Sequence, residues 1–170
     1  MFRAAFVLAS LAASVPAATA FAEGPAPRFP AIAAENLARE RVALPGGLAG
    51  TYNLVVVAYR RQQQADVDTW MPALGAIEKD DVRFRWYELP TIGKLTGVFV
   101  SPWLDDAMRA GIPDAGQRAR TITLYVDKQW FRQALGLPDS DDAIHLLLLD
   151  RQGLVLWRRD GRHDPAAIAE

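Results

Sequence analysis

Two nearly continuous apolar runs constrain the fold of this chain more than any other feature. Residues 52–58 read Tyr-Asn-Leu-Val-Val-Val-Ala, and residues 144–149 are apolar apart from one histidine. Successive side chains of a strand point to opposite faces, so a strand that is apolar at nearly every position must be covered on both faces. We therefore predict a central sheet that is flanked by helices on each side.

The remaining elements alternate between strand and helix patterns. Asp66 is expected to cap a helix that extends to about residue 79, because apolar residues recur there at helical spacing. Residues 82–88 alternate between apolar and polar side chains, which predicts a strand with one wetter face at the margin of the sheet. The other predicted strands are residues 41–44, 121–126 and 154–158, and the other predicted helices are residues 102–110, 128–135 and the start of a last helix at 165–170.

The order of these elements predicts the fold class. Strands and helices alternate in the first part of the chain, whereas a turn at residues 150–153 joins the last two strands as a hairpin. Alternation favours parallel strands, and a hairpin requires an antiparallel pair. We predict an α/β three-layer sandwich with a mixed central sheet, parallel at its centre, and a C-terminal β-hairpin plus helix. This domain is expected over residues 36–170, after an extended lead over residues 23–35.

The N-terminus has the pattern of a secretory signal peptide. Arg3 precedes an apolar run over residues 4–15, and small residues lead to an Ala-x-Ala step that ends at Ala22, with a second step that ends at Ala20. The apolar run is shorter than the about 20 residues that span a bilayer. We therefore predict a signal peptide over residues 1–22 and an exported protein. Its expected location is the periplasm of a Gram-negative-type bacterium, with no membrane span after cleavage.

Charge and cysteine content exclude several function classes. The chain has 20 acidic and 19 basic residues and a net charge of −1, so it has no basic field to attract nucleic acid or an anionic membrane surface. It contains no cysteine, which excludes a thiol nucleophile, a dithiol redox couple and a Cys-ligated metal site. Because it has only two histidines and no glycine-rich nucleotide-binding motif, neither a metal nor another cofactor is predicted.

Two segments resemble the thioredoxin-like superfamily, in the form shared by peroxiredoxins and exported thiol–disulfide proteins. The more telling segment is residues 121–161. It has a strand that ends in aspartate, a short helix closed by Gly136, and a hairpin of the form strand–Asp150-x-x-Gly153–strand. The other segment is residues 53–72. The resemblance implies a thioredoxin-like three-layer sandwich.

The same resemblance implies what this chain lacks. Members of the superfamily carry a Cys-x-x-Cys motif at the start of the helix after the central strand, where the helix dipole lowers the thiol pKa. Pro72 matches a proline that is usual in that helix, and counting back from it places Gln64 and Val67 at the positions of the two cysteines. A cis-proline of the superfamily falls near Ile144, where no proline is present. The resemblance therefore implies the fold without dithiol chemistry.

A further resemblance is to assembly factors of the membrane sector of the mitochondrial F-type ATP synthase, and to their bacterial look-alikes. It rests on the Trp-Met-Pro step at residues 70–72 and on the closing segment at residues 149–158. It implies an assembly-factor role with an envelope or membrane protein as partner.

The candidate binding surface is the edge at which the central strand ends and the next helix begins. Sheets of this class place ligand sites at such carboxyl ends, and guanidinium groups beside a helix N-terminus can hold a carboxylate or a phosphate. An exposed Trp103 would add an aromatic contact to a partner. The candidate binding residues are Arg60, Arg61, Gln62, Gln64, Asp66, Trp103 and Ile144.

Two interpretations of this edge are open. In the first, the chain is a non-redox binding, accessory or assembly-factor protein of the cell envelope without enzymatic activity. In the alternative, Arg60, Asp66 and His145 serve an enzyme or a small-ligand binder as acid–base and anion-holding groups. The acidic stretch at residues 139–142 lacks the spacing of a calcium loop and is expected to be a solvated turn.

Overall fold

A computed structural model of the chain describes residues 26–93 and 100–164, without the side chains of residues 100–103. The predicted signal peptide over residues 1–22 and the predicted helix start at 165–170 lie outside the described residues. No helix within the described ranges is long and apolar enough to cross a membrane.

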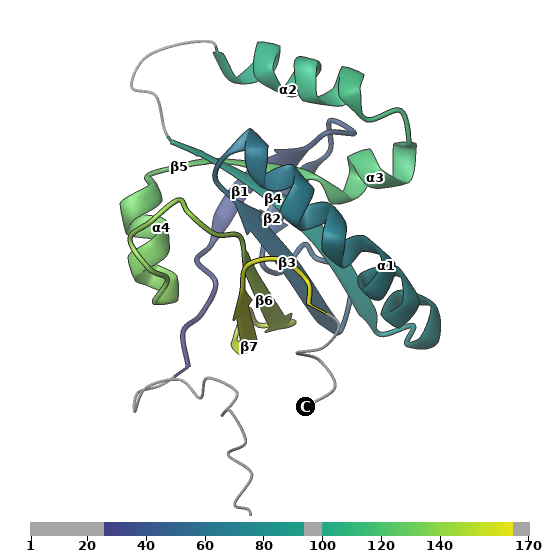
Figure 1. Cartoon of the computed structure of the whole chain (residues 1–170), viewed down its shortest axis with the longest axis vertical. Helices are drawn as coiled ribbons and strands as arrows, with labels where there is room; N and C mark the ends of the chain where they lie inside the picture. Colours follow the sequence, from purple (N-terminus) through teal and green to yellow (C-terminus); the bar gives the residue numbers. More distant parts are fainter. Residues whose placement is uncertain (1–25, 94–99, 165–170) are drawn as a thin grey trace, which may run out of the picture.

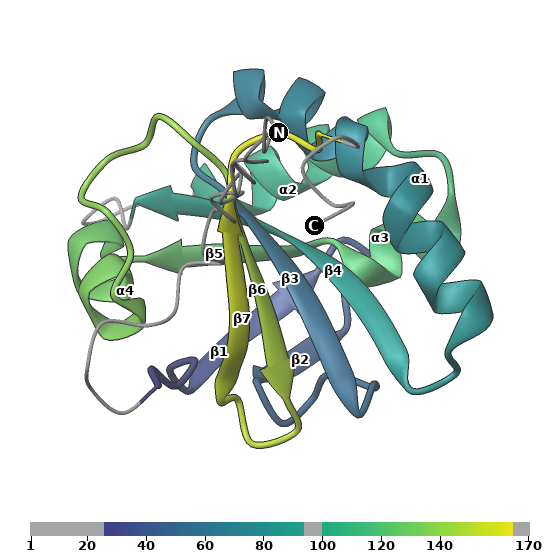
Figure 2. The same ribbon diagram turned by 60° about the horizontal axis from the view of Figure 1, so that its bottom comes forward.

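Seven strands form one mixed sheet in the order β2-β1-β5-β4-β3-β6-β7 (Figures 1 and 2). The pairs β3–β4 and β4–β5 are parallel and the other pairs are antiparallel, so the sheet is parallel at its centre, as predicted. The strands are β1 (Ile32–Asn36), β2 (Arg41–Leu44), β3 (Tyr52–Ala58), β4 (Phe84–Gly93), β5 (Ile122–Val126), β6 (His145–Asp150) and β7 (Val155–Asp160). The helices are the short 3-10 helix η1 (Arg61–Gln63), α1 (Gln64–Asp80), α2 (Val100–Gly111), α3 (Ala115–Arg120) and α4 (Lys128–Leu135).

Two hydrophobic cores, one on each face of the sheet, produce the three layers. The alternating side chains of β3 divide between them, because Leu54 and Val56 pack on the side of α1 whereas Val55 and Val57 pack on the side of α4. This arrangement confirms that residues 52–58 form a central strand covered on both faces. The helices contribute Val67, Trp70 and Leu74 from α1 and Phe131 and Leu135 from α4.

β4 is a central strand, and its predicted place at the margin of the sheet is wrong. It extends from Phe84 to Gly93 and lies between β3 and β5. Its first half pairs with β3 alone, because β5 meets β4 only from a bridge at Glu88 onward. β3 pairs with β4 as far as Pro90, and residues 91–93 pair with β5 alone, so the strand lies between two neighbours although few of its residues pair on both sides. The alternation over residues 82–88 matches the two faces of the strand, because Phe84 and Trp86 are buried whereas Arg85 and Tyr87 are half-buried.

Three further elements differ from the predictions. β1 forms at the end of the segment predicted as an extended lead, where it joins the sheet between β2 and β5. α3 is not predicted from the sequence; Asp114 caps it by accepting a hydrogen bond from the backbone N–H of Gln117 at 2.6 Å. α1 begins at Gln64, so Asp66 lies in its first turn and is not its N-cap. The reason is η1, which turns the chain into the helix before Asp66 is reached.

Candidate functional site

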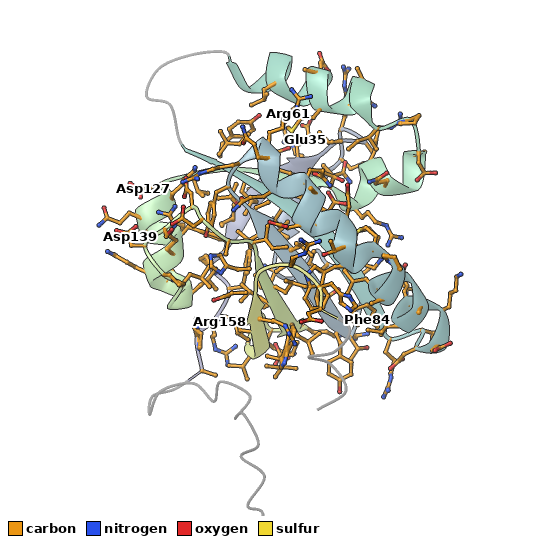
Figure 3. The ribbon with its side chains drawn as sticks, in the orientation of Figure 1. Glu35, Arg61, Phe84, Asp127, Asp139 and Arg158 are labelled. Carbon is orange, nitrogen blue, oxygen red and sulfur yellow. The ribbon has the colours of Figure 1, made fainter. Side chains whose placement is uncertain are left out.

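The carboxyl end of β3 leads directly into α1 through η1. We call residues 60–64 at this junction the β3–α1 edge. The side chains of Arg60, Arg61, Gln62 and Gln64 are exposed there, and Figure 3 labels Arg61 just before α1. The structure thus brings four of the seven candidate residues together on one exposed segment.

Gln63 is the buried member of the β3–α1 edge and holds it in place. Its Oε1 accepts hydrogen bonds from the backbone N–H groups of Tyr59 at 2.7 Å and Arg60 at 3.0 Å. Its Nε2 donates a hydrogen bond to the backbone carbonyl of Asp141 at 2.9 Å. One side chain therefore satisfies three backbone groups and ties the end of the central strand to a loop that is distant in the sequence.

Asp141 is the centre of a cluster of ion pairs beside this edge. Its carboxylate pairs with Lys128 Nζ at 2.9 Å and with the guanidinium group of Arg132, both from α4. Arg132 is only 8% exposed and pairs also with Asp139 at 3.0 Å. The expectation of a solvated turn at residues 139–142 is therefore wrong for Asp141, because two poorly exposed cations require its charge.

The ring of Tyr59 lies between these cations and His145. The ring centroid is 4.6 Å from the guanidinium carbon of Arg132, 5.4 Å from Lys128 Nζ and 5.8 Å from the centroid of the His145 ring. Burial raises the pKa of the Tyr59 hydroxyl above its ordinary value, and the charge of Arg132 opposes this shift. Tyr59 and His145 are 7% and 2% exposed, so neither is accessible to a substrate in solvent.

His145, the acid–base group of the alternative interpretation, is enclosed at the start of β6. Its Nδ1 is 2.7 Å from Oδ1 of Asp160, its cross-strand partner on β7. Burial alone would raise the pKa of Asp160, but the hydrogen bond and charge of His145 and the charge of Arg158 lower it below its ordinary value. Within the described residues, no hydrogen bond or ion pair joins His145 to Arg60 or Asp66.

The structure places the remaining candidate residues apart from the exposed edge. Ile144 is 0% exposed and belongs to the core on the side of α1, so its side chain cannot meet a partner. Asp66 is half-buried in the first turn of α1. Trp103 lies in α2, and its side chain is outside the described residues. In the described part of the chain, no three His, Asp or Glu side chains gather in a way that could hold a metal ion.

The sequence contains one signal that locates the ion-pair cluster, although it is not among the candidate residues above. Lys128 and Arg132 are four residues apart in a helix, so they lie on the same face one turn apart. Three aspartates follow that helix within residues 139–142. The complementary charges of the two segments indicate that they meet, whereas no local pattern indicates that Gln63 is buried.

Glu88 is a buried carboxyl group next to Gln64, and it too is absent from the candidate residues. It lies on β4 and is 5% exposed. Burial raises the pKa of its carboxyl above the ordinary value, and the adjacent side-chain amides of Gln64 and Gln117 oppose this shift. Gln64, which the resemblance aligns with a cysteine of the superfamily, thus lies beside a buried acid in this chain.

Replacing Glu88 with glutamine is expected to stabilise the fold at neutral pH by about 1–2 kcal/mol. The pKa of Glu88 is higher in the folded state than in the unfolded state, so the folded state binds more protons. Stability therefore falls as the pH rises through the window above the ordinary value of 4.5. Glutamine carries no charge, so the gain from Glu88→Gln should disappear at the acidic end of that window.

Urea unfolding at neutral pH and at the acidic end of the window checks this prediction. Asp80→Asn, at an exposed position near the end of α1, is the matched control and should change little. A Glu88→Gln variant that is less stable than the wild type at neutral pH would contradict the burial argument.

Comparison with known proteins identifies the fold. No protein-family model matches the chain, and no curated protein matches its sequence. A thiol:disulfide interchange protein from Bacteroides sp. matches with a TM-score of 0.52 and 16% identity, over 80% of this chain and 81% of that chain. BsSco, a member of the Sco family of cytochrome c oxidase assembly proteins, matches with a TM-score of 0.55 and 12% identity, over 87% of this chain and 92% of that chain. The exposed lipoprotein thioredoxin of Streptococcus pneumoniae matches with a TM-score of 0.51 and 12% identity, over 82% of this chain and 96% of that chain.

These likenesses show that the chain has a thioredoxin-like fold. Within that fold it is a cysteine-free protein, since none of its 170 residues is cysteine. Its own side chains therefore cannot carry out thiol–disulfide exchange, which proceeds through a thiolate. The fold and the missing thiols together fit a non-redox role.

Proposed function

We propose that this chain is exported to the cell envelope and acts there as a non-redox binding protein, in an accessory or assembly role, through its β3–α1 edge. The observation that carries the proposal is the replacement of the thiol positions at the start of α1 by exposed Gln64 and buried Val67, next to a segment fixed by Gln63. A fixed backbone with exposed side chains suits recognition, because less conformational entropy is lost on binding.

The arginines of the edge indicate the chemistry of the partner. Arg61 is exposed, and no carboxylate of the described residues forms an ion pair with it. Arg60 is 3.5 Å from Asp142, but the two side chains are 52% and 81% exposed, so this pair is weak. Both guanidinium groups are available to a partner carboxylate. An acidic segment of an envelope or membrane protein fits this surface.

Two likenesses support an assembly role. BsSco has the same fold and is described as a member of a family of cytochrome c oxidase assembly proteins. The resemblance of residues 70–72 and 149–158 to ATP synthase assembly factors gives one candidate complex. The alternative interpretation, with His145 as the acid–base group, gains less support because that imidazole is 2% exposed and already bonded to Asp160.

Capture of the tagged protein after chemical crosslinking in its native envelope tests this proposal. The wild type and the control Arg83→Ala, at the opposite end of the parallel strands, should recover the same complex, and the double variant R60A/R61A should lose it. Recovery of the same proteins by the double variant would contradict a role for the edge.

Two further measurements test export and the absence of redox activity. The N-terminus of the captured protein should follow Ala20 or Ala22, and the purified protein should reduce insulin no faster than buffer.

A further inference from the structure

A groove lies between helices α1 and α3, which are neighbours on one face of the sheet (Figures 1 and 2). We call it the α1–α3 groove. Residues of both helices line it, Trp86 of β4 lines it from the sheet, and it shares no lining residue with the β3–α1 edge. Its volume is about 430 Å³, which is in the range of sites for small molecules, about 300–1,000 Å³.

Trp86 brings an unsatisfied donor to this groove. The residue is 9% exposed, and its indole Nε1 is shielded from solvent and has no hydrogen-bond partner among the described residues. Arg120 covers the face of the ring, with its guanidinium carbon 4.5 Å from the ring centroid, so the need that remains is at the N–H group. A buried donor without a partner costs free energy, and an acceptor in the groove would remove that cost.

Glu78 brings an unsatisfied acceptor to the same groove. Its Oε2 accepts a hydrogen bond from Nη1 of Arg120 at 2.9 Å. Its Oε1 is shielded from solvent and accepts no hydrogen bond within the described part of the chain, since Nε of Arg85, at 3.9 Å, is beyond hydrogen-bond distance. A donor and an acceptor therefore line one groove without satisfying each other.

Gly75 leaves the wall of α1 bare between these groups and the rim. A glycine in the middle of a helix is less stable than an alanine. Apart from the backbone of α1 itself, a Cβ at position 75 would meet no atom of the described residues within 4 Å, so packing inside the chain does not require the glycine. Close approach of a ligand to the helix backbone would explain the missing side chain.

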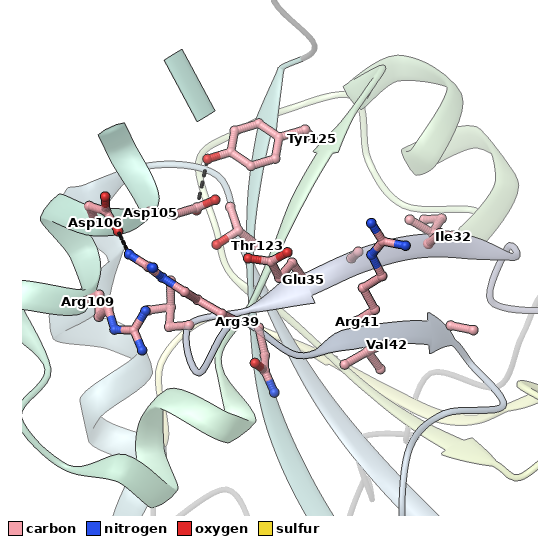
Figure 4. A pocket seen from close by; sticks show the side chains of 15 residues that line it. Ile32, Glu35, Arg39, Arg41, Val42, Asp105, Asp106, Arg109, Thr123 and Tyr125 are labelled. Atoms are coloured by element: carbon pink, nitrogen blue, oxygen red, sulfur yellow. Dashed lines mark hydrogen bonds and ion pairs between the residues drawn. The ribbon is translucent and has the colours of Figure 1, made fainter. Parts of the chain in front are cut away.

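The larger groove between the β1–β2 hairpin and α2, of about 900 Å³, differs in this respect (Figure 4). Its Asp105 is the hydrogen-bond partner of the Tyr125 hydroxyl, at 2.9 Å, and of the Thr123 hydroxyl. Its Asp106 pairs with Arg39 at 2.9 Å. These polar groups are paired within the chain, so they do not indicate a ligand.

The charges that line the α1–α3 groove indicate a neutral ligand. Glu78 and Asp114 are acidic, and Lys79 and Arg120 are basic, so the lining has no net charge that would attract an ion. An apolar ligand would leave the buried groups of Trp86 and Glu78 unsatisfied. A neutral ligand with several hydroxyl groups fits both requirements, because each hydroxyl can donate and accept a hydrogen bond.

We propose that the α1–α3 groove binds a neutral sugar. One sugar oxygen accepts a hydrogen bond from Nε1 of Trp86, and one sugar hydroxyl donates a hydrogen bond to Oε1 of Glu78. The sugar ring lies against Gly75, where α1 has no side chain. The flexible side chains of Met71 and Lys79, which also line the groove, move aside to admit it. This site is independent of the proposed function of the β3–α1 edge.

NMR of the indole N–H groups tests the proposal on the side of the ligand. The Trp86 signal is assigned by its loss in Trp86→Phe, and the purified protein is titrated with glucose, galactose and N-acetylglucosamine. We expect at least one of these sugars to shift the Trp86 signal saturably at millimolar concentration, and cationic glucosamine and anionic glucuronate to bind no tighter. No saturable shift with any of the three neutral sugars would overturn the proposal. Binding of a charged sugar about threefold tighter or more would overturn the neutral character of the site.

Variants test it on the side of the protein. Gly75→Leu places a side chain in the groove and should abolish sugar binding, while leucine favours a helix more than glycine does. Ala76→Leu, at the next position of α1, is exposed and outside the groove, so this matched control should bind as the wild type does. Trp86→Phe, followed at the backbone amide of Gly75, should weaken binding about fivefold or more because one hydrogen bond is lost. Equal affinity in the wild type, Gly75→Leu and Trp86→Phe would place the sugar elsewhere and overturn the proposal.

Discussion

Replacing Asp141 with alanine is expected to lower the free energy of unfolding by about 2–4 kcal/mol and the melting temperature by about 5–10 °C. The Asp141 side chain is 22% exposed, and it pairs with Lys128 and Arg132, whose side chains are 24% and 9% exposed. Removal of the carboxylate leaves two poorly solvated cations near each other, and this repulsion adds to the lost attraction. Thermal unfolding followed by circular dichroism measures the effect.

Asp142→Ala is the matched control for this prediction. Asp142 is the next residue in the same loop, but its side chain is 81% exposed, and its ion pair with Arg60 is long, at 3.5 Å. Its replacement should change stability by less than about 0.5 kcal/mol. Equal losses of unfolding free energy in Asp141→Ala and Asp142→Ala would contradict the prediction, because they would show that the ion pairs of Asp141 do not contribute more than the exposed pair of Asp142.

Replacing Gln63 with alanine is expected to cost about 2–3 kcal/mol and to loosen the β3–α1 edge. The variant loses hydrogen bonds from the backbone N–H groups of Tyr59 and Arg60 and one to the carbonyl of Asp141. The buried amide of Tyr59 then has no partner, so its hydrogen exchange should become faster. Hydrogen exchange read by NMR at this amide checks the prediction directly.

Gln62→Ala is the control for the effect of Gln63. Gln62 is the preceding residue of η1, and its side chain is exposed. Its replacement should leave both stability and the exchange of the Tyr59 amide unchanged. Unchanged protection of that amide in Gln63→Ala would mean that another group holds the end of β3.

The fold is predictable from the sequence where local patterns decide it. The apolar run at residues 52–58 predicts a strand covered on both faces, because burial of both faces leaves few polar positions, and here only Asn53 among residues 53–58 is polar. The helix over residues 128–135 is predicted to the residue, since Asp127 caps its start and Gly136, with φ of 62°, ends it in the left-handed region. β1 has no comparable signal, because its short sequence IAAEN is exposed at alternate positions.

The candidate site is predictable only in its exposed part. Arg60, Arg61, Gln62 and Gln64 follow the central strand, so their place at its carboxyl end follows from the order of the elements. The groups that fix the edge depend on tertiary contacts, such as the hydrogen bond between Gln63 and the carbonyl of Asp141, 78 residues later. No local periodicity encodes a contact at that separation, and the same holds for the burial of Glu88.

We propose that the β3–α1 edge, where the resemblance to the thioredoxin-like superfamily places a cysteine, is a binding surface in this chain. A photo-crosslinking amino acid at position 62, activated in living cells, tests it most directly, with the same amino acid at position 82 as control. Val82 is 81% exposed and precedes β4 at the opposite end of the sheet. We expect one discrete crosslinked product from position 62, none from position 82, and loss of that product when Arg60 and Arg61 are replaced by alanine. No product from position 62, or the same product from both positions, would contradict the claim.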